Sequence, residues 1–97
     1  PDLSNTADYV FEPDYPLMSL QDVKTIIQTK KHLPGVPSAK EMVENGVSIA
    51  EMNATLLQKI EELTLYVIQQ DEKITNQEKQ LNALRQYVTA DQIISAR

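Results

Sequence analysis

A seven-residue repeat runs without interruption from Ile49 to Val88 and restricts what this chain can fold into. Apolar residues that recur about every 3.5 positions give a helix a narrow stripe that only other helices can cover. With Asn53 as an a position, the a series is Asn53, Ile60, Val67, Ile74, Leu81 and Val88, and the d series is Ile49, Leu56, Leu63, Gln70, Gln77 and Leu84. We therefore expect a coiled coil with these residues in its core.

The composition also predicts association. The 97 residues are 41% hydrophobic but include one Phe and no Trp, which leaves little material for a globular core. Small chains bury too small a fraction of their surface to be stable alone unless disulfides, metals or partner chains help. The chain has no Cys, so disulfides are excluded and partner chains are expected.

Charge and hydropathy exclude two kinds of partner. The formal net charge of -5 opposes binding to a nucleic-acid backbone or to an anionic membrane surface. No apolar run approaches the length of about 20 residues that spans a bilayer. We expect no nucleic-acid partner and no membrane insertion.

Capping signals predict two short helices before the repeat. Ser19, with Asp22 three residues later, begins a helix over about 20–31, and prolines make 32–37 a turn. Ser38 opens a second helix over about 39–44. Since Gly accepts the left-handed conformation common at helix ends, Asn45-Gly46 is expected to close it.

A third capping signal, Ser48 with Glu51, opens the long helix. The sequence thus divides into a head region, 1–47, and a coiled-coil helix, 48–97, which frays after about residue 90. The predicted fold is mainly α: a short extended segment around Tyr9-Val10-Phe11 and two short helices, packed on a long C-terminal helix that forms a parallel trimeric coiled coil.

Apolar residues outside the core series predict where the head packs. Between Ile49 and Ile68 the helix carries extra apolar residues at flanking positions, and these become polar or charged beyond Asp71. We expect the aromatic residues of the head to pack against this part of the helix. The residues predicted for this contact are Tyr9, Phe11, Tyr15, Leu57, Leu65 and Ile68.

The number of strands is open between two and three. Ile and Val at a with Leu at d favour a parallel dimer. Gln70 and Gln77 in consecutive d layers, with a wide apolar face, favour a trimer, in which three Gln amides can bond around the axis. We favour the trimer. Asn53 would fix the register in either form, and Lys73 at g with Glu78 at e is an interchain charge pair that fits parallel strands.

An ordered series of residues resembles the C-terminal domain of tail-fibre-like bacterial and phage surface proteins. The resemblance covers about residues 7–75. It is carried by Asp8-Tyr9-Val10-Phe11, Asp14-Tyr15, His32-Leu33-Pro34, Pro37-Ser38, Glu41, Asn45-Gly46, Glu51-Met52-Asn53 and the run from Leu56 to Tyr66.

The resemblance implies an extracellular, cell-surface or virion location and a role in assembly. In such proteins the domain ends a long fibre, in a position similar to that of the intramolecular chaperone domains of phage tail spikes. Its role would be to bring three chains into register so that the upstream fibre folds. Self-cleaving chaperones begin with a Ser-Asp pair, but Ser4 is followed by Asn5, so no autoproteolysis is expected.

Catalytic and cofactor sites are not expected. His32 is the only His, beside prolines, whereas metal sites need several ligands together. Glu61 and Glu62 are expected on a solvated face rather than as an acid and base pair. With two Gly residues and no Cys, the chain lacks a phosphate-binding loop and a thiol nucleophile.

Two functions follow from this sequence. The first is a trimerisation and assembly module of a fibre-like protein that acts as an intramolecular chaperone. The second is a tip domain that presents Tyr9, Phe11 and Tyr15 to a receptor or partner protein on a coiled coil. Substitution of these aromatic residues by Ala distinguishes the two, because core residues would unfold the domain.

Overall fold

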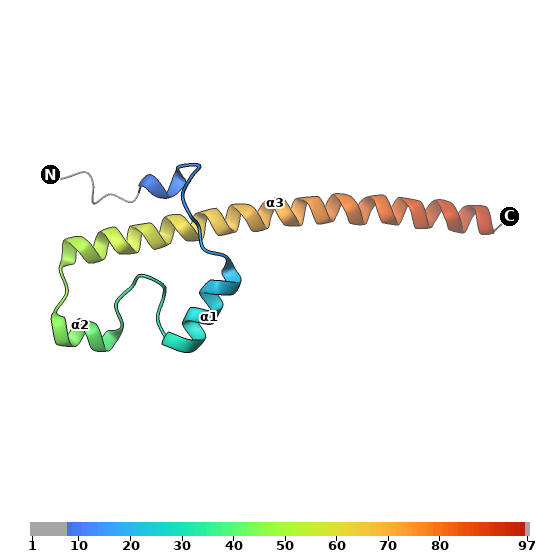
Figure 1. The fold of residues 1–97 in the computed structure, drawn as a ribbon. Coiled ribbons are helices and arrows are strands. Elements are labelled where there is room, and N and C mark those ends of the chain that lie inside the picture. The colour runs from blue at the N-terminus through green and yellow to red at the C-terminus, as the bar shows by residue number, and fades with distance from the viewer. Residues whose placement is uncertain (1–7, 97) are drawn as a thin grey trace. The chain divides into compact units, whose positions relative to one another are not determined.

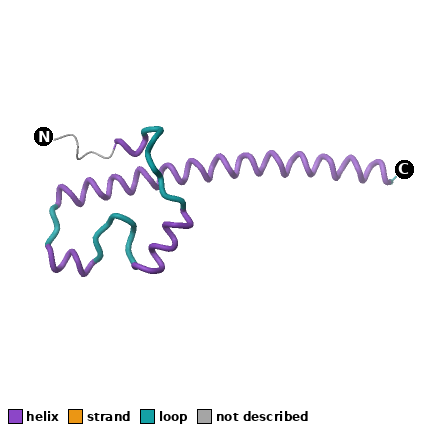
Figure 2. The backbone as a smooth tube through the Cα atoms, in the orientation of Figure 1, coloured by secondary structure: helices purple, strands orange, loops and turns teal. Residues whose placement is uncertain are grey.

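The computed structural model describes residues 8–96, which form an all-α structure without strands (Figures 1 and 2). Three α-helices follow in order: α1 (Leu20–Lys30), α2 (Ala39–Asn45) and α3 (Ile49–Ser95). Helix α3 has 47 residues and is mostly exposed. The mainly helical fold with a long C-terminal helix is therefore confirmed, and its exposure is consistent with an oligomeric coiled coil.

The expected serines cap the helices. Ser38 and Glu41 form a full capping box, in which the Glu41 N–H donates to Ser38 Oγ at 3.1 Å and the Ser38 N–H donates to Glu41 Oε1 at 3.3 Å. Ser19 and Ser48 each accept a hydrogen bond from the backbone N–H three residues later. These bonds satisfy donors that a helix start leaves without an intrahelical partner, so the local sequence fixes where each helix begins.

The predicted extended segment around Tyr9 is wrong. Asp8–Phe11 forms a 3₁₀ helix, η2. A turn follows it, in which the Tyr15 N–H donates to Glu12 O at 3.1 Å with Pro13 in the second position. Aromatic and β-branched residues favour strands only where a sheet offers them neighbours. No sheet is present in residues 8–96, and Pro13 favours a turn because its φ is fixed near the value that this position needs.

The loop between α1 and α2 turns at Pro34 and Gly35. The Val36 N–H donates to Leu33 O at 3.1 Å, and Gly35 has φ of 75°. Pro followed by a residue with positive φ is the signature of a type II turn, and Gly accepts this conformation without steric cost. A Cβ on Gly35 would lie 3.7 Å from the Lys59 ammonium of α3, so the turn contacts α3 directly.

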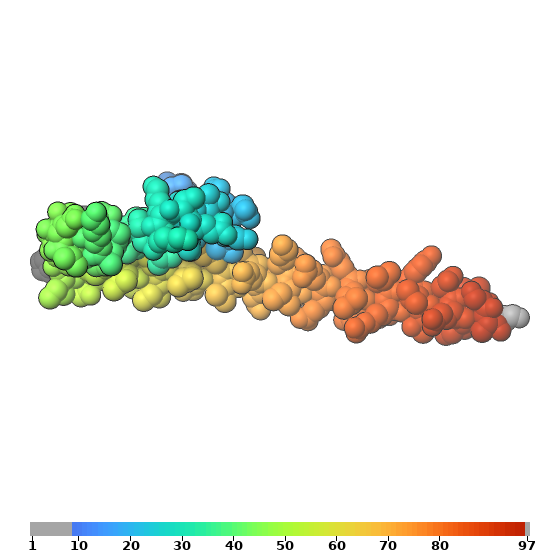
Figure 3. Space-filling model, turned by 90° about the horizontal axis from the view of Figure 1, so that it is seen from below, coloured from blue at the N-terminus to red at the C-terminus, as the bar shows by residue number. Residues whose placement is uncertain are grey.

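The chain forms two compact units. The first ends at Thr64 and contains η2, α1, α2 and the start of α3. In this unit the atoms of the head, coloured blue to green in Figure 3, lie against the start of α3. The second unit begins at Leu65 and consists of the rest of α3, where every side chain from Val67 to Ala96 is exposed. The sequence-based division at 1–47 and 48–97, and the fraying after residue 90, stay predictions.

Candidate functional site

The candidate functional site is the heptad stripe of α3. All twelve predicted core residues are exposed in the single chain. The nine apolar members have exposed fractions between 43% and 77%; they are Ile49, Leu56, Ile60, Leu63, Val67, Ile74, Leu81, Leu84 and Val88. Aliphatic side chains of this size gain about 1.5–3 kcal/mol each when they are fully buried. A continuous series left exposed therefore indicates self-association.

The head covers a different face of α3. In the first unit, the buried or half-buried side chains of α3 all stand at heptad positions b, c, f and g: Met52, Ala54, Thr55, Gln58, Lys59, Glu61 and Glu62. The a, d and e positions there are exposed. Positions b, c and f lie opposite the a and d stripe of a helix. The head therefore occupies the back of the helix and leaves the stripe accessible to other chains.

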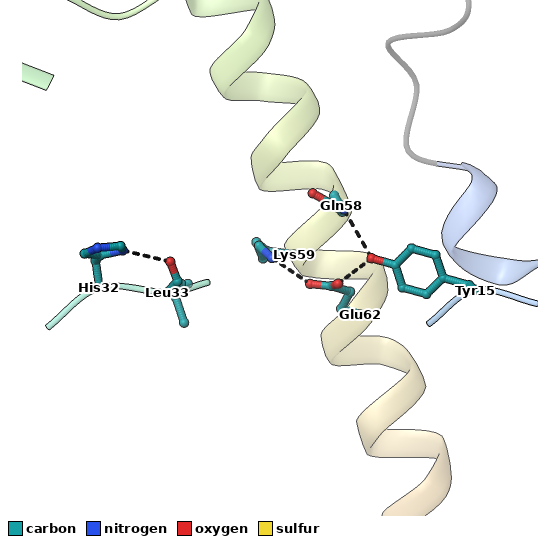
Figure 4. A network of polar contacts seen from close by, with 6 residues as sticks. All are labelled: Tyr15, His32, Leu33, Gln58, Lys59 and Glu62. Atoms are coloured by element: carbon teal, nitrogen blue, oxygen red, sulfur yellow. Dashed lines mark hydrogen bonds and ion pairs between the residues drawn. The ribbon is translucent and has the colours of Figure 1, made fainter. Parts of the chain in front are cut away.

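A polar network joins the head to this covered face (Figure 4). The Tyr15 hydroxyl donates to Glu62 Oε2 at 2.5 Å and accepts from Gln58 Nε2 at 3.1 Å. The other oxygen of Glu62 accepts from Lys59 Nζ at 2.9 Å. Charge-assisted bonds of this kind are stronger than neutral ones. Tyr15 therefore links residues of α3 to a head segment more than forty positions earlier in the chain.

The network changes the protonation chemistry of Tyr15. Burial, followed by the hydrogen bond to Glu62, raises the pKa of Tyr15 from 10.0 to about 12. Burial disfavours the charged phenolate, and loss of the proton would break the hydrogen bond that the phenol donates to Glu62. The Lys59–Glu62 ion pair has side chains only 16% and 14% exposed. The network is therefore a shielded contact that holds the head, with the phenol protonated at neutral pH.

The aromatic residues of the head divide into two groups. Tyr15 is half-buried, whereas Tyr9 and Phe11 are 48% and 53% exposed. The rings of Tyr9 and Tyr15 lie 5.7 Å apart between centroids at an interplanar angle of 53°. This distance is within the favourable range for aromatic pairs. Of the three aromatic residues predicted for packing, Tyr15 thus makes the hydrogen-bonded contact with α3.

Sequence reasoning missed Val10, which is 1% exposed and is the buried apolar residue of the described core. A 3₁₀ helix turns once in about three residues, so three successive side chains point in three directions. Val10 points inward in η2, and its two aromatic neighbours remain accessible. A strand would have placed Tyr9 and Phe11 on one face and Val10 on the other. The expectation of an extended segment therefore assigned the two aromatic residues, and not Val10, to the core.

The remaining predicted packing residues lie on α3. Leu57 is 41% exposed and Ile68 is 47% exposed, whereas Leu65 is half-buried. Leu57 stands at an e position beside the stripe. Packing of these three residues with the head stays a prediction, and the exposed Leu57 extends the accessible apolar face beyond positions a and d.

The predicted solvated face for Glu61 and Glu62 is wrong. Glu61 is 7% exposed and Glu62 takes part in the shielded network with Tyr15. Their b and c positions would face solvent on a bare coiled coil, but the head covers this side of α3. The burial results from contacts with residues far away in the sequence, which the heptad pattern does not contain.

His32 lies in the loop between α1 and α2. His32 Nδ1 lies 2.9 Å from Leu33 O, next to its own chain (Figure 4), and residues 8–96 contain no group of three metal-ligating side chains. No helix in that range is long and apolar enough to cross a bilayer. Ser4, for which no autoproteolysis was expected, lies outside the described residues.

No family model, no curated protein and no solved structure matches this chain.

Proposed function

We propose that this chain is a trimerisation and assembly module at the C-terminal end of a fibre-like surface protein, where it sets chain register as an intramolecular chaperone. The separation of two faces on α3 carries this proposal. The head occupies the back of the helix through Tyr15 and Glu62, and the apolar stripe stays exposed. Because the head does not cover the stripe, α3 can associate with other copies of itself without releasing its head.

Three strands fit the stripe better than two. The exposed apolar face includes Leu57 at an e position, and a two-stranded seam of a and d residues leaves such flanking residues mostly in water. Gln70 and Gln77, both exposed in the single chain, occupy d layers where three amides can bond to one another. A parallel dimer is the alternative.

Register is the second requirement of the proposal. Asn53 is the polar first member of an otherwise apolar a series, so a pairing shifted by one heptad would bury its amide against Ile60. An unpaired buried amide costs about 1–3 kcal/mol, which disfavours shifted pairings. The chaperone role follows from register, because aligned helices also align the chain segments that precede them.

Mass measurement in solution tests the assembly. Sedimentation equilibrium at several concentrations should return three times the 11.0 kDa chain mass. A mass of one chain at micromolar concentration would overturn the proposal, and a mass of two chains would replace the trimer by the dimer.

Single cysteines test the direction and register of the strands, because the chain has no native Cys. Ile60→Cys places one thiol at the same a layer of each parallel chain and should give interchain disulfides on mild oxidation. Lys79→Cys, at the outward f position, is the control and should give none. If Ile60→Cys stays uncrosslinked while the mass shows an oligomer, the strands are antiparallel or shifted.

The chaperone role has its own test. Deletion of the segment from Ile49 onward, in a fibre that carries this chain at its end, should leave the fibre unassembled or insoluble. Soluble trimeric fibre from this truncation would contradict the role. Retained trimerisation of the isolated chain would still support the assembly module.

A tip domain for a receptor is the second candidate, and the exposure of Tyr9 and Phe11 favours it. Exposed aromatic side chains are common at protein interfaces. Tyr9→Ala and Phe11→Ala should leave the circular dichroism spectrum unchanged, and a loss of binding to a host surface would support this role. Unfolding of either variant would place the aromatic residues in the core instead.

A further inference from the structure

A cavity of about 130 Å³ lies where the α2–α3 connection meets the first turns of α3. Its lining includes Pro37 and Val47 from the head and Met52 from α3. Met52 is half-buried and stands at a g position, at the edge of the exposed stripe. The rest of the lining is largely polar, so the apolar part beside Met52 is where an aliphatic side chain can pack.

The heptad pattern identifies what faces Met52 in a parallel assembly. In such a coil a g residue of one chain lies beside the e residue of its neighbour in the next heptad, five positions later. The residue five positions after Met52 is Leu57, which stands at e and is 41% exposed. In a parallel assembly, Met52 at the edge of the cavity of one copy therefore faces an exposed Leu on the next.

The charged residues of the same helix support this register independently. Lys73 stands at g and Glu78 at e, separated by the same five positions. Opposite charges at this spacing attract one another between parallel chains. The offset that pairs Lys73 with Glu78 thus pairs Met52 with Leu57.

We infer that Leu57 of each copy packs at the cavity beside Met52 of the neighbouring copy, so that every head clasps the next chain as well as its own. The occupant is a second copy of this chain. This inference deepens the proposed function and rests on it. Glu51 also lines the cavity, which makes an acidic occupant unfavourable.

A double cysteine variant tests the contact. In Met52→Cys with Leu57→Cys, oxidation should join each chain to both neighbours and give a covalent trimer on a non-reducing gel. Within one helix these two positions point to nearly opposite sides, so an intrachain disulfide is sterically excluded. Each single variant is a control and should give no ring-closed trimer.

The outcomes separate this inference from the proposed function. An oligomer by mass that forms no disulfide overturns the Leu57 contact and leaves the assembly module intact. Chains that stay monomeric overturn both. A covalent dimer overturns the three-chain form of both.

Leu57→Asp provides a second measurement without cysteines. It should keep the trimer mass, because the a and d residues are unchanged, and should lower the Tm by roughly 5 °C or more. Val43→Asp is the matched control, since Val43 is 86% exposed on α2 and should change the Tm little. Equal Tm values for Leu57→Asp and the unmodified chain would overturn the contact.

Discussion

The hydroxyl of Tyr15 donates a 2.5 Å hydrogen bond to the carboxylate of Glu62, a residue 47 positions later in the chain. The bond connects the segment after η2 to the covered face of α3. Gln58 and Lys59 complete the network, so both oxygens of Glu62 and the oxygen of Tyr15 are hydrogen-bonded. The head is thus attached to α3 by directional bonds.

Tyr15→Phe should reduce the free energy of unfolding by about 1.5–3 kcal/mol, because it removes the donor to a shielded carboxylate. Urea unfolding followed by circular dichroism measures the loss. Tyr87→Phe makes the same chemical change on a side chain that is 71% exposed and should have little effect. Equal stability of the two variants would contradict a stabilising role for the Tyr15 bond.

Alkaline pH should weaken the same contact. The pKa of Tyr15 is raised from 10.0 to about 12, so between these values the folded chain keeps a proton that the unfolded chain has lost. Stability is therefore fully present below pH 10 and falls as the pH rises towards 12. Urea unfolding across this range should show the fall, and Tyr15→Phe should reduce it. A fall of the same size in Tyr15→Phe would assign it to other groups.

An acidic residue in the stripe should dissociate the assembly. Ile60→Asp places a charge in an a layer, where burial of an unpaired carboxylate is strongly unfavourable. Lys79→Asp introduces the same residue at an f position of α3 and should leave the mass unchanged. Sedimentation equilibrium compares the two variants. An intact oligomer of Ile60→Asp would show that the stripe is not the interface.

The capping box of α2 gives a prediction for acidic pH. The backbone N–H of Ser38, followed by its side chain, lowers the pKa of Glu41 below 4.5. The stabilisation from Glu41 is therefore present at neutral pH and is lost as the pH falls through its lowered pKa. Glu41→Gln should show a weaker loss of helix signal on acidification. An unchanged acid profile would mean that the box does not stabilise α2 measurably.

Ser38→Ala removes the other half of this box and should cost about 1 kcal/mol at neutral pH. Ser38→Thr keeps a hydroxyl that accepts from the Glu41 N–H and is the control. Thermal unfolding distinguishes the two variants. Equal Tm values would contradict a role for the Ser38 hydroxyl in starting α2.

The helices could be predicted from the sequence because their signals are local. A capping serine and its partner lie three residues apart, and the heptad repeat needs only the spacing of apolar residues in α3. Ser38 with Glu41 shows this, since both expected bonds are present. The exposed stripe follows from the same repeat.

The contact between the head and α3 was harder to predict because it depends on residues far apart in the chain. Tyr15 was expected to pack there, but its bond to Glu62 requires the turn at Pro13 to bring the phenol onto a c position. The burial of Val10 depends on the 3₁₀ conformation of η2. The sequence did not indicate this conformation, because the aromatic residues on either side of Val10 are typical of an extended segment. A coiled-coil pattern alone assigns Glu61 and Glu62 to water.

The placement of the head at positions b, c, f and g has a consequence for how the molecule can change. In an assembly of the proposed kind, α3 from Met52 to Glu62 lies between sister helices on one side and its own head on the other. Along this part of α3, surrounding molecules can contact only the outer surface of the heads. Residues on this outer surface can be exchanged, by evolution or by design, while the a and d residues that determine the number of chains stay buried between the helices.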